Sequence, residues 1–231
     1  MTSIPSRAPA EPRWPEGRRA PQSEPSSLGR LGDAALLGLW LRRRRDAPSA
    51  AMIADALIAR FGTLGDAAAA DPDELARVDE VAFEVIADLK LLRELSVRLA
   101  RAEACRRPVL SSSNALLAYA RTALAHLPRE QFRTLYFDHR NNLMRDEWVA
   151  DGTVDHAPVY PREVIRRALE ISASALVLVH NHPSGDPSPS QADIAMTRQI
   201  VDGARLFGLQ VHDHLVVGRE GTASFRALGL M

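Results

Sequence analysis

The segment from Ala175 to Asp193 constrains the fold more than any other part of the sequence. It begins with the apolar run Ala-Leu-Val-Leu-Val, which is typical of a buried central strand. Two histidines, His180 and His182, follow directly and are separated by one residue. Because successive side chains on a strand alternate between its faces, we expect both imidazoles on the same face, at the carboxyl end of the strand.

The residues after the strand lead into a helix. The loop from Pro183 to Pro189 contains three prolines, so it has few conformations to lose when it folds. Ser190 follows, and Asp193 comes three residues later, a spacing typical of a helix N-terminus. The loop can therefore bring Asp193 back towards the two histidines.

His180, His182 and Asp193 together predict a metal site. Two imidazoles on one face can reach a single ion at about 2.0–2.1 Å, and the Asp193 carboxylate can supply a third ligand. Three protein ligands leave the fourth tetrahedral position for water, as in catalytic rather than structural zinc sites. Each part alone has a simpler explanation, because Ser-x-x-Asp is also a helix cap and histidines often end strands. The combination favours the metal site.

The same residues carry a resemblance to a known family. The spacing His-x-His, seven residues, Ser, two residues, Asp matches the JAMM (MPN-type) metalloprotease motif. The stretch HNHPSGDPSPSQAD, with PREV before it and HDHLVVG after it, resembles the RadC family of bacterial proteins. The resemblance covers residues 107–231 strongly and residues 28–106 more loosely.

This resemblance implies a fold and a set of roles. The fold would be an α/β (α+β) JAMM/MPN-like domain with a mixed sheet flanked by helices, preceded by a small all-α domain. His180, His182 and Asp193 would bind one zinc ion per chain. Glu130, which precedes the first strand of the domain, would act as general acid and base on the zinc-bound water, and Ser190 would stabilise the oxyanion. The implied reaction is hydrolysis of a peptide or isopeptide-like amide bond.

Other carboxylates near the motif have simpler explanations. Glu163 is expected to cap its own helix, and it is the next candidate for the base if Glu130 does not fill that role. Glu147 is interpreted as a solvated charge on a strand. Asp186 either orients a histidine ligand or forms an Asx turn within the loop, and the residues favour neither.

The remaining histidines do not predict a further site. His212 and His214 flank Asp213 on a strand, and RadC-like sequences carry an Asp-His pair there, so we expect a structural or supporting role rather than a second zinc. His126, His139 and His156 are scattered through the sequence and receive no role.

The chain divides into three regions. Residues 1–27 contain six prolines, mixed charges and few apolar residues, so we expect a disordered tail. Residues 28–106 show helical periodicity and predict an all-α domain, with helices near 36–41, 48–61 and 81–101 and another starting at Pro72. Residues 107–231 predict one sheet with helices: strands at 132–138, 143–150, 175–179 and 209–217, and helices at 114–127, 161–169 and 191–207.

Composition excludes several classes of protein. The 231 residues carry 29 basic and 29 acidic side chains, which argues against a strongly basic protein that wraps nucleic acid. One cysteine, Cys105, excludes a disulfide framework or a Cys-rich zinc module and favours the cytoplasm. We expect no membrane span, because no apolar run approaches about 18 residues, and no secretory signal.

A role in DNA binding is the alternative. The N-terminal helices of RadC-like proteins resemble a helix-hairpin-helix unit, whose hairpin glycines let backbone amides approach phosphate. The equivalent stretch here, Leu75–Glu84, has no glycine and places Asp79 and Glu80 where phosphate would come. The arginine run 42–45 could contact nucleic acid, although a solvated helix end is the simpler explanation. The sequence thus favours a zinc metallohydrolase acting on a protein or peptide, with a DNA-repair-associated accessory protein as the alternative.

Overall fold

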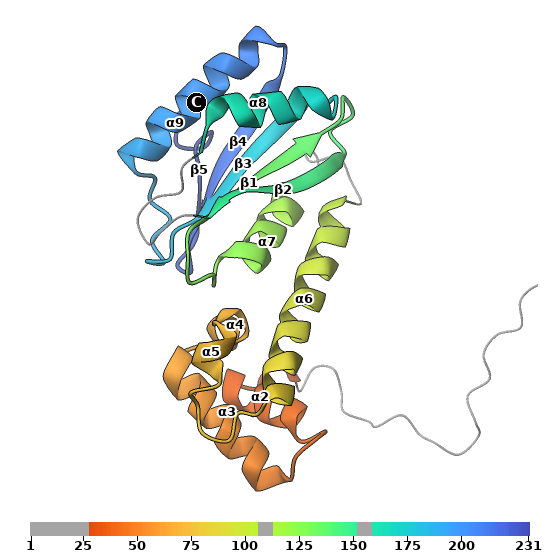
Figure 1. Cartoon of the computed structure of the whole chain (residues 1–231), viewed down its shortest axis with the longest axis vertical. Coiled ribbons are helices and arrows are strands. Elements are labelled where there is room, and N and C mark those ends of the chain that lie inside the picture. The colour runs from red at the N-terminus through yellow and green to blue at the C-terminus, as the bar shows by residue number, and fades with distance from the viewer. Residues whose placement is uncertain (1–27, 106–112, 152–158) are drawn as a thin grey trace, which may run out of the picture.

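The computed structural model describes residues 28–105, 113–151 and 159–231. One mixed sheet lies between two layers of helices, and a separate group of helices lies at the far end of a long helix (Figure 1). The predicted disordered tail, the boundary predicted at 106/107 and His156 all fall outside the described residues. The mixed α/β architecture is the fold expected for a JAMM/MPN-like domain preceded by a helical part.

The sheet has five strands in the order β2-β1-β3-β4-β5. Strand β3 pairs antiparallel with β1 and parallel with β4, while β2 and β5 pair antiparallel at the two edges. The strands span Gln131–Phe137 (β1), Leu143–Asp151 (β2), Ala175–Asn181 (β3), Gln210–Val217 (β4) and Thr222–Ser224 (β5). The end of β3, where the predicted ligands begin, therefore lies in the middle of the sheet.

Strand β3 is central because both of its faces are apolar. All seven of its residues are buried, as the sequence Ala-Leu-Val-Leu-Val predicts. Leu176 and Leu178 face a core shared with α8 (Pro161–Glu170) and α9 (Gln191–Leu206). Val177 and Val179 face the opposite core, formed with α7 (Ser113–Leu124) and the end of α6 (Phe83–Cys105).

The helices of the sheet region begin where the sequence predicts. Pro161 occupies the first turn of α8, where its missing N–H is not needed. Ser190 caps α9 through a reciprocal pair of hydrogen bonds with Asp193, which is a capping box. The small strand β5 was not predicted, because three residues are too few to show a periodicity.

Within the described residues, the helical part places four helices against the first half of α6. They span Asp33–Leu41 (α2), Ala47–Phe61 (α3), Leu64–Ala69 (α4) and Pro72–Leu75 (α5). Their buried side chains form a core of their own with Val85 and Leu89 of α6. Asp46, Thr63 and Asp71 cap the last three of these helices through their side chains.

The hairpin that lacks glycine keeps the backbone conformation that glycine normally supplies. Glu80, in the turn between α5 and α6, has a φ of 62°, the left-handed region that favours glycine. Asp79 and Glu80 are both exposed. The turn therefore presents two exposed carboxylates.

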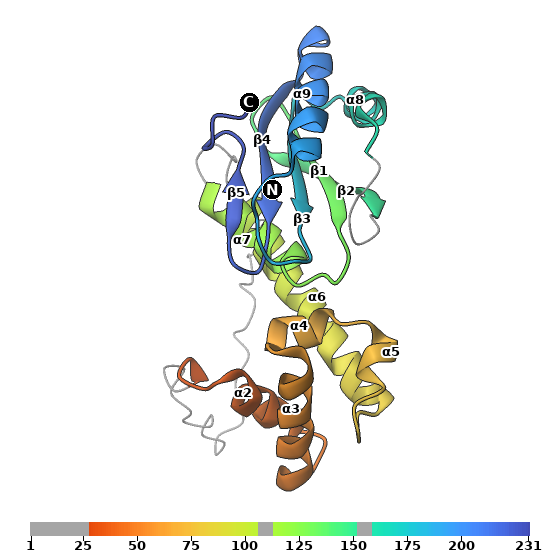
Figure 2. The same ribbon diagram turned by 90° about the vertical axis from the view of Figure 1, so that its left-hand side faces the viewer.

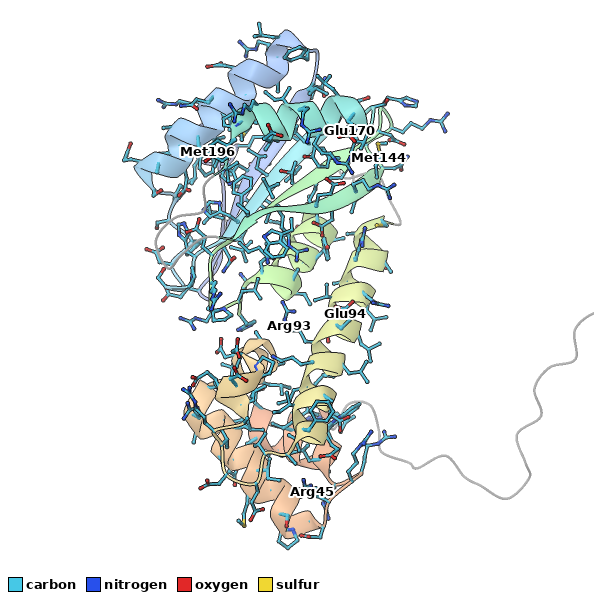
Figure 3. The ribbon with its side chains drawn as sticks, viewed as in Figure 1. Arg45, Arg93, Glu94, Met144, Glu170 and Met196 are labelled. Atoms are coloured by element: carbon cyan, nitrogen blue, oxygen red, sulfur yellow. The ribbon has the colours of Figure 1, made fainter. Side chains whose placement is uncertain are left out.

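Helix α6 connects the two parts of the molecule (Figure 2). Its first half packs in the core of the helical part, and Val97, Ala100 and Ala104 near its end pack under the sheet with α7. Arg93, midway along it, donates a hydrogen bond of 2.8 Å to the carbonyl of Ala123 at the end of α7 (Figure 3). Within the described ranges, no helix combines the length and apolar character that crossing a bilayer requires.

Candidate metal centre

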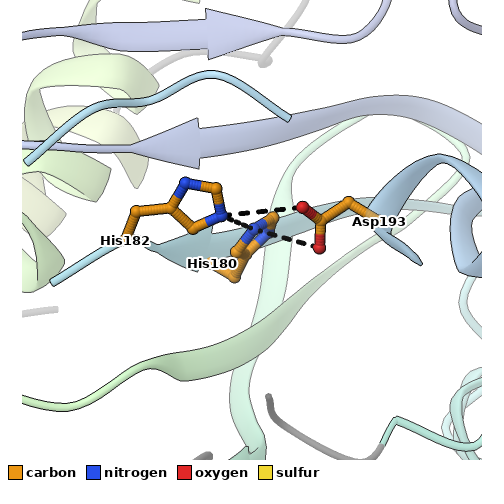
Figure 4. Close-up of side chains that lie close together, drawn as sticks. All are labelled: His180, His182 and Asp193. Atoms are coloured by element: carbon orange, nitrogen blue, oxygen red, sulfur yellow. Dashed lines mark hydrogen bonds and ion pairs between the residues drawn. The ribbon is translucent and has the colours of Figure 1, made fainter. Parts of the chain in front are cut away.

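The three predicted ligands meet at the end of β3 (Figure 4). His180 and His182 project from the end of the strand and the first residue beyond it, on the same face. Asp193 comes from the first turn of α9, which the loop 183–189 returns to the sheet. The structure therefore brings the three side chains together at this end of the sheet.

The ligand atoms have the spacing of a tetrahedral ion. His180 Nε2 lies 3.0 Å from His182 Nε2. The Asp193 oxygens lie 3.4 Å from His180 Nε2 and 3.6 Å from His182 Nε2. Two ligands held about 2.0–2.1 Å from a tetrahedral zinc would be about 3.3 Å apart. Two imidazoles and a carboxylate at these separations match the donors and the geometry that zinc requires.

The outer nitrogens of both histidines have partners that orient the rings. His182 Nδ1 lies 2.9 Å from the carbonyl oxygen of Asp186, which can only accept a hydrogen bond. His182 therefore carries its proton on Nδ1 and presents the Nε2 lone pair to the site. His180 Nδ1 lies 2.8 Å from Nε2 of His214 on β4. Both histidines are thus oriented by a hydrogen-bond partner at Nδ1, on the side of the ring away from the candidate site, as in known zinc sites.

Asp193 is held as an anion. Burial alone would raise the pKa of its carboxyl group, but the contacts of its oxygens with His180 and His182 outweigh burial and keep that pKa well below its usual range. The Ser190 backbone N–H and hydroxyl also donate to Asp193 Oδ2, at 2.7 and 2.6 Å. The nearby Asp193 carboxylate raises the pKa of His182 in turn. Asp193 is thus in the ionised form that can bind a cation.

Glu130 lies next to this cluster. Phe132 pairs with His180 at the end of the β1–β3 ladder, and Glu130 precedes Phe132 by two residues, just before β1 begins. The negative charge of Glu130 also contributes to the raised pKa of His182. Glu130 is half-buried. The structure therefore brings the predicted base to the histidine side of the site.

Asn181, between the two histidines, was not predicted from the sequence. Its fully buried side chain accepts a 2.9 Å hydrogen bond from the backbone N–H of Gln131. Its amide nitrogen donates to the carbonyl of Arg129 at 3.1 Å and, more weakly, to that of Leu127 at 3.5 Å. Asn181 thus holds the segment that carries Glu130. No local pattern signals this role, because its partners lie some fifty positions away in the chain.

His214 is the second residue that the sequence did not assign to a definite contact. It is fully buried, and burial lowers the pKa of its imidazole well below the usual value. His212 is separate from the site and contacts Asn141 at 2.6 Å. Among the described residues, His180, His182 and Asp193 form the one group of three His, Cys, Asp or Glu side chains placed to share an ion.

The competing carboxylates lie elsewhere or have other partners. Glu163 pairs with Arg166 and lines a hollow beside Tyr136. Tyr136 pairs with Leu176, so this hollow lies about 13 Å along β3 from His180. Glu147 forms a two-pronged ion pair with Arg167, at 2.7 and 2.6 Å, so it is a bridging rather than a solvated charge.

Asp186 combines the two roles that the sequence left open. Its side chain accepts a hydrogen bond of 2.9 Å from the N–H of Ser188, an Asx turn. Its backbone carbonyl, and not its carboxylate, contacts His182. The Asx turn therefore places the carbonyl that orients the ligand.

The loop 183–189, which joins His182 to the helix of Asp193 and is called the ligand loop below, packs tightly against the β4–β5 turn. Gly185 has a φ of +102°, which a side chain would strain. A Cβ at Gly218 would lie 2.0 Å from the Gly185 carbonyl oxygen, so only glycine allows this approach. Arg219 donates to the carbonyls of Pro183 and Ser184, at 3.0 and 3.3 Å. The loop is therefore held along its backbone.

Comparison with known proteins gives consistent matches. Residues 110–230 match the family model described as the RadC-like JAB domain. A UPF0758 protein of Rhodobacter capsulatus is 53% identical over 201 residues, which cover 87% of this chain and 94% of the relative. A UPF0758 protein of Ruegeria pomeroyi is 49% identical over 201 residues, covering 87% of this chain and 90% of the relative.

Proposed function

Because the chain belongs to the RadC family and carries a RadC-like JAB domain, we propose that it is a zinc-dependent hydrolase of peptide or isopeptide-like amide bonds. The observation that carries the proposal is the convergence of His180 Nε2, His182 Nε2 and the Asp193 carboxylate at the spacing of a tetrahedral ion. Each chain would hold one zinc ion through these three side chains.

Zinc held here would act as a Lewis acid and make a water molecule acidic enough to attack at neutral pH. The side chains supply the rest of the machinery. His182 and Asp193 are partly exposed, at 19% and 13%, whereas the His180 side chain is fully buried. A substrate would therefore approach from the side of His182 and Asp193.

Glu130 is the proposed general base and acid. Its position close to His182 would let its carboxylate take a proton from the attacking water and return it to the leaving amine nitrogen. Asn181 would fix the position of Glu130 by holding the segment around it. We assign Ser190 to the oxyanion because it stands beside Asp193 at the edge of the site; its hydroxyl, which donates to Asp193 Oδ2 here, would turn its proton towards the bound substrate.

The first test is the metal content of the purified, untagged protein. About one zinc per chain is expected for the wild type and a sharp decrease for Asp193→Ala. Asp202→Ala is the matched control, because this exposed carboxylate lies on the same helix as Asp193 but nine residues further along it. Absence of zinc from the wild type, even after zinc is supplied, would overturn the proposal.

The second test separates binding from chemistry. The zinc-loaded protein would be screened against libraries of quenched fluorescent peptides and lysine-linked isopeptides. Glu130→Gln should abolish any hydrolysis while zinc stays bound, and Glu163→Gln should retain activity because Glu163 pairs with Arg166 away from the site. Full activity of Glu130→Gln would show that the base is another residue.

DNA binding is the second candidate function, and it is disfavoured. Asp79 and Glu80 are exposed at the hairpin turn. In the arginine run 42–45, Arg44 pairs with Asp88 at 3.3 Å and Arg43 lies over the Trp40 ring. Salt-dependent retardation of a DNA duplex that persists after zinc removal would support this function instead. We place the proposed hydrolase in the cytoplasm, the reducing compartment favoured by a chain with one cysteine.

A further inference from the structure

A chain of hydrogen bonds runs from one proposed ligand to another behind the metal centre. His180 Nδ1 lies 2.8 Å from His214 Nε2. His214 Nδ1 lies 2.6 Å from the hydroxyl oxygen of Thr197, on α9. The Thr197 hydroxyl in turn donates a 2.6 Å hydrogen bond to the backbone carbonyl of Asp193. Three elements, β3, β4 and α9, are therefore connected from His180 to Asp193.

The carbonyl of Asp193 gives this chain a direction. A carbonyl oxygen can only accept, so the Thr197 hydroxyl uses its proton there and offers only lone pairs to His214. His214 must then carry its proton on Nδ1, facing Thr197, which leaves its Nε2 as an acceptor. His180 must in turn donate from Nδ1. In the neutral ring, Nε2 is then left with the bare lone pair that a metal ion needs.

The surroundings prevent other arrangements. His180, Thr197 and His214 are at most 1% exposed, so water is not available to replace a lost partner. The His214 ring stacks on Phe225 at a centroid distance of 4.5 Å and meets the edge of Phe132 at 5.6 Å. Phe132 also stacks on His180, at 5.9 Å. The two aromatic rings hold His214 in one orientation between its two partners.

We propose that Thr197 and His214 are positioning residues that select the metal-binding tautomer of His180 before any ion arrives. The inference rests on the proposed zinc site and extends it to two residues that would not touch the ion. The inference gives His214, next to Asp213 on β4, a specific function. It also gives α9 a second contribution, Thr197, besides the proposed ligand Asp193.

The test is Thr197→Val, which keeps the shape of the side chain and removes only the hydroxyl. His214 then has no acceptor at Nδ1 and can reverse its tautomer, donating from Nε2 to His180 Nδ1. His180 would carry its proton on Nε2, where the metal should bind. Zinc affinity, measured by competition with a chromophoric chelator, should fall about 10- to 100-fold.

Two matched variants serve as controls. Thr197→Ser keeps the hydroxyl and should bind zinc with wild-type affinity. His212→Ala removes the other histidine of the same strand, which contacts Asn141 and not the site, and it should also bind zinc normally. His214→Gln, whose amide can both accept and donate, should bind more tightly than His214→Leu. Melting temperatures would verify that each variant is folded.

A second readout does not depend on affinity. In metal-free protein with nitrogen-15-labelled histidine, long-range NMR correlations distinguish a proton on Nδ1 from one on Nε2. The wild type should show His180 and His214 protonated on Nδ1, and Thr197→Val should show His180 protonated on Nε2. Equal zinc affinity and equal tautomers in the two proteins would overturn the positioning role alone. A wild type that binds no zinc would overturn the proposed function and this inference together.

Discussion

Asn181 lies between two histidines on β3, and its side chain points to the opposite side of the strand from theirs. Its neighbours His180 and His182 face the metal centre, while its own amide points to the segment 127–131 on the other side. A buried side-chain amide whose donor and acceptor are both hydrogen-bonded stabilises the fold modestly. Removing the amide leaves its buried backbone partners without hydrogen bonds, which destabilises the fold. Asparagine at this position therefore ties the end of β3 to the start of β1.

Replacing this residue should affect stability more than metal binding. Asn181→Ala leaves the Gln131 N–H and the Arg129 carbonyl without their partner, so we expect a loss of about 1–3 kcal/mol in the free energy of unfolding. Chemical denaturation measures this loss, and Asn142→Ala, at an exposed turn, is the control with a loss of about 0.5 kcal/mol or less. A loss no larger than that of the control would show that water replaces the amide.

At the scale of elements, the ligand loop depends on the turn that faces it. Gly218 lies against the Gly185 carbonyl, and the N–H of Glu220 donates to the same carbonyl at 3.1 Å. A side chain at Gly218 must push the two backbones apart, because neither is a flexible side chain that can move aside. The β4–β5 turn is thus part of the support for His182.

Gly218→Ala should therefore damage both stability and the site. We expect a loss of about 1–3 kcal/mol in unfolding free energy together with weaker zinc binding, since the loop carries His182 and leads to Asp193. Gly221→Ala is the matched control, because a Cβ there meets Pro187 Cγ at an ordinary 3.7 Å. Denaturation and chelator competition measure the two effects. Normal zinc affinity in Gly218→Ala would mean that the loop adapts without moving the ligands.

Helix α8 is fastened to the edge strand β2 by the ion pair of Arg167 with Glu147. The hydrogen bond from Arg167 lowers the pKa of Glu147 below its usual value. A carboxyl group whose pKa is lower in the folded than in the unfolded chain stabilises the fold above its unfolded pKa, about 4.3. That contribution is lost as the pH falls through the folded pKa.

Glu147→Gln should accordingly be less stable than the wild type at neutral pH, by about 1 kcal/mol or less, as for other partly exposed pairs. The difference should disappear at acid pH, below the folded pKa of Glu147, where the wild-type carboxyl is also neutral. Denaturant unfolding of both proteins across this pH range measures the difference. A difference independent of pH would mean that packing, and not charge, is responsible.

The sequence predicted those elements and ligands whose determinants are local. Strand β3 follows from five consecutive apolar residues, and His180, His182 and Asp193 lie within one short segment with a recognisable spacing. Helix α4, with six residues, and β5, with three, are too short to show a periodic pattern. Asn181 and Thr197 act through partners distant in the chain, which only the three-dimensional fold brings near.

At the scale of the whole molecule, the helical part contacts the sheet part, which carries the candidate metal centre, through more than α6. A carboxylate oxygen of Asp66, on α4, lies 3.0 Å from Nδ1 of His126, a residue that comes just before the segment carrying Glu130. The same oxygen lies 3.6 Å from Arg219, which holds the ligand loop. A Cβ at Gly65 would lie 2.6 Å from the His126 ring, so the two parts approach closely. The helical core nevertheless has its own set of buried side chains.

Zinc binding should therefore slow backbone hydrogen exchange to different extents in the sheet part and the helical part. Ligand binding stabilises the folded state, by about 2.7 kcal/mol at a hundredfold excess over the dissociation constant, and it suppresses local opening near the site. We expect backbone hydrogen exchange to slow most at the end of β3 and the start of α9, and least in α3. Exchange measured with and without zinc tests this. Equal slowing in α3 would show that the whole chain opens as one cooperative unit.

The capping box at the start of α9 has a consequence for the timing of metal loading. Ser190 and Asp193 hold each other by bonds that belong to the helix itself, so the carboxylate is in place without any ion. In small zinc modules the metal and the fold form together, and the newly made chain must capture its ion in order to fold. If the proposed zinc site is correct, we expect folding to precede capture here, so that a mature molecule could lose its ion and be recharged when zinc becomes available.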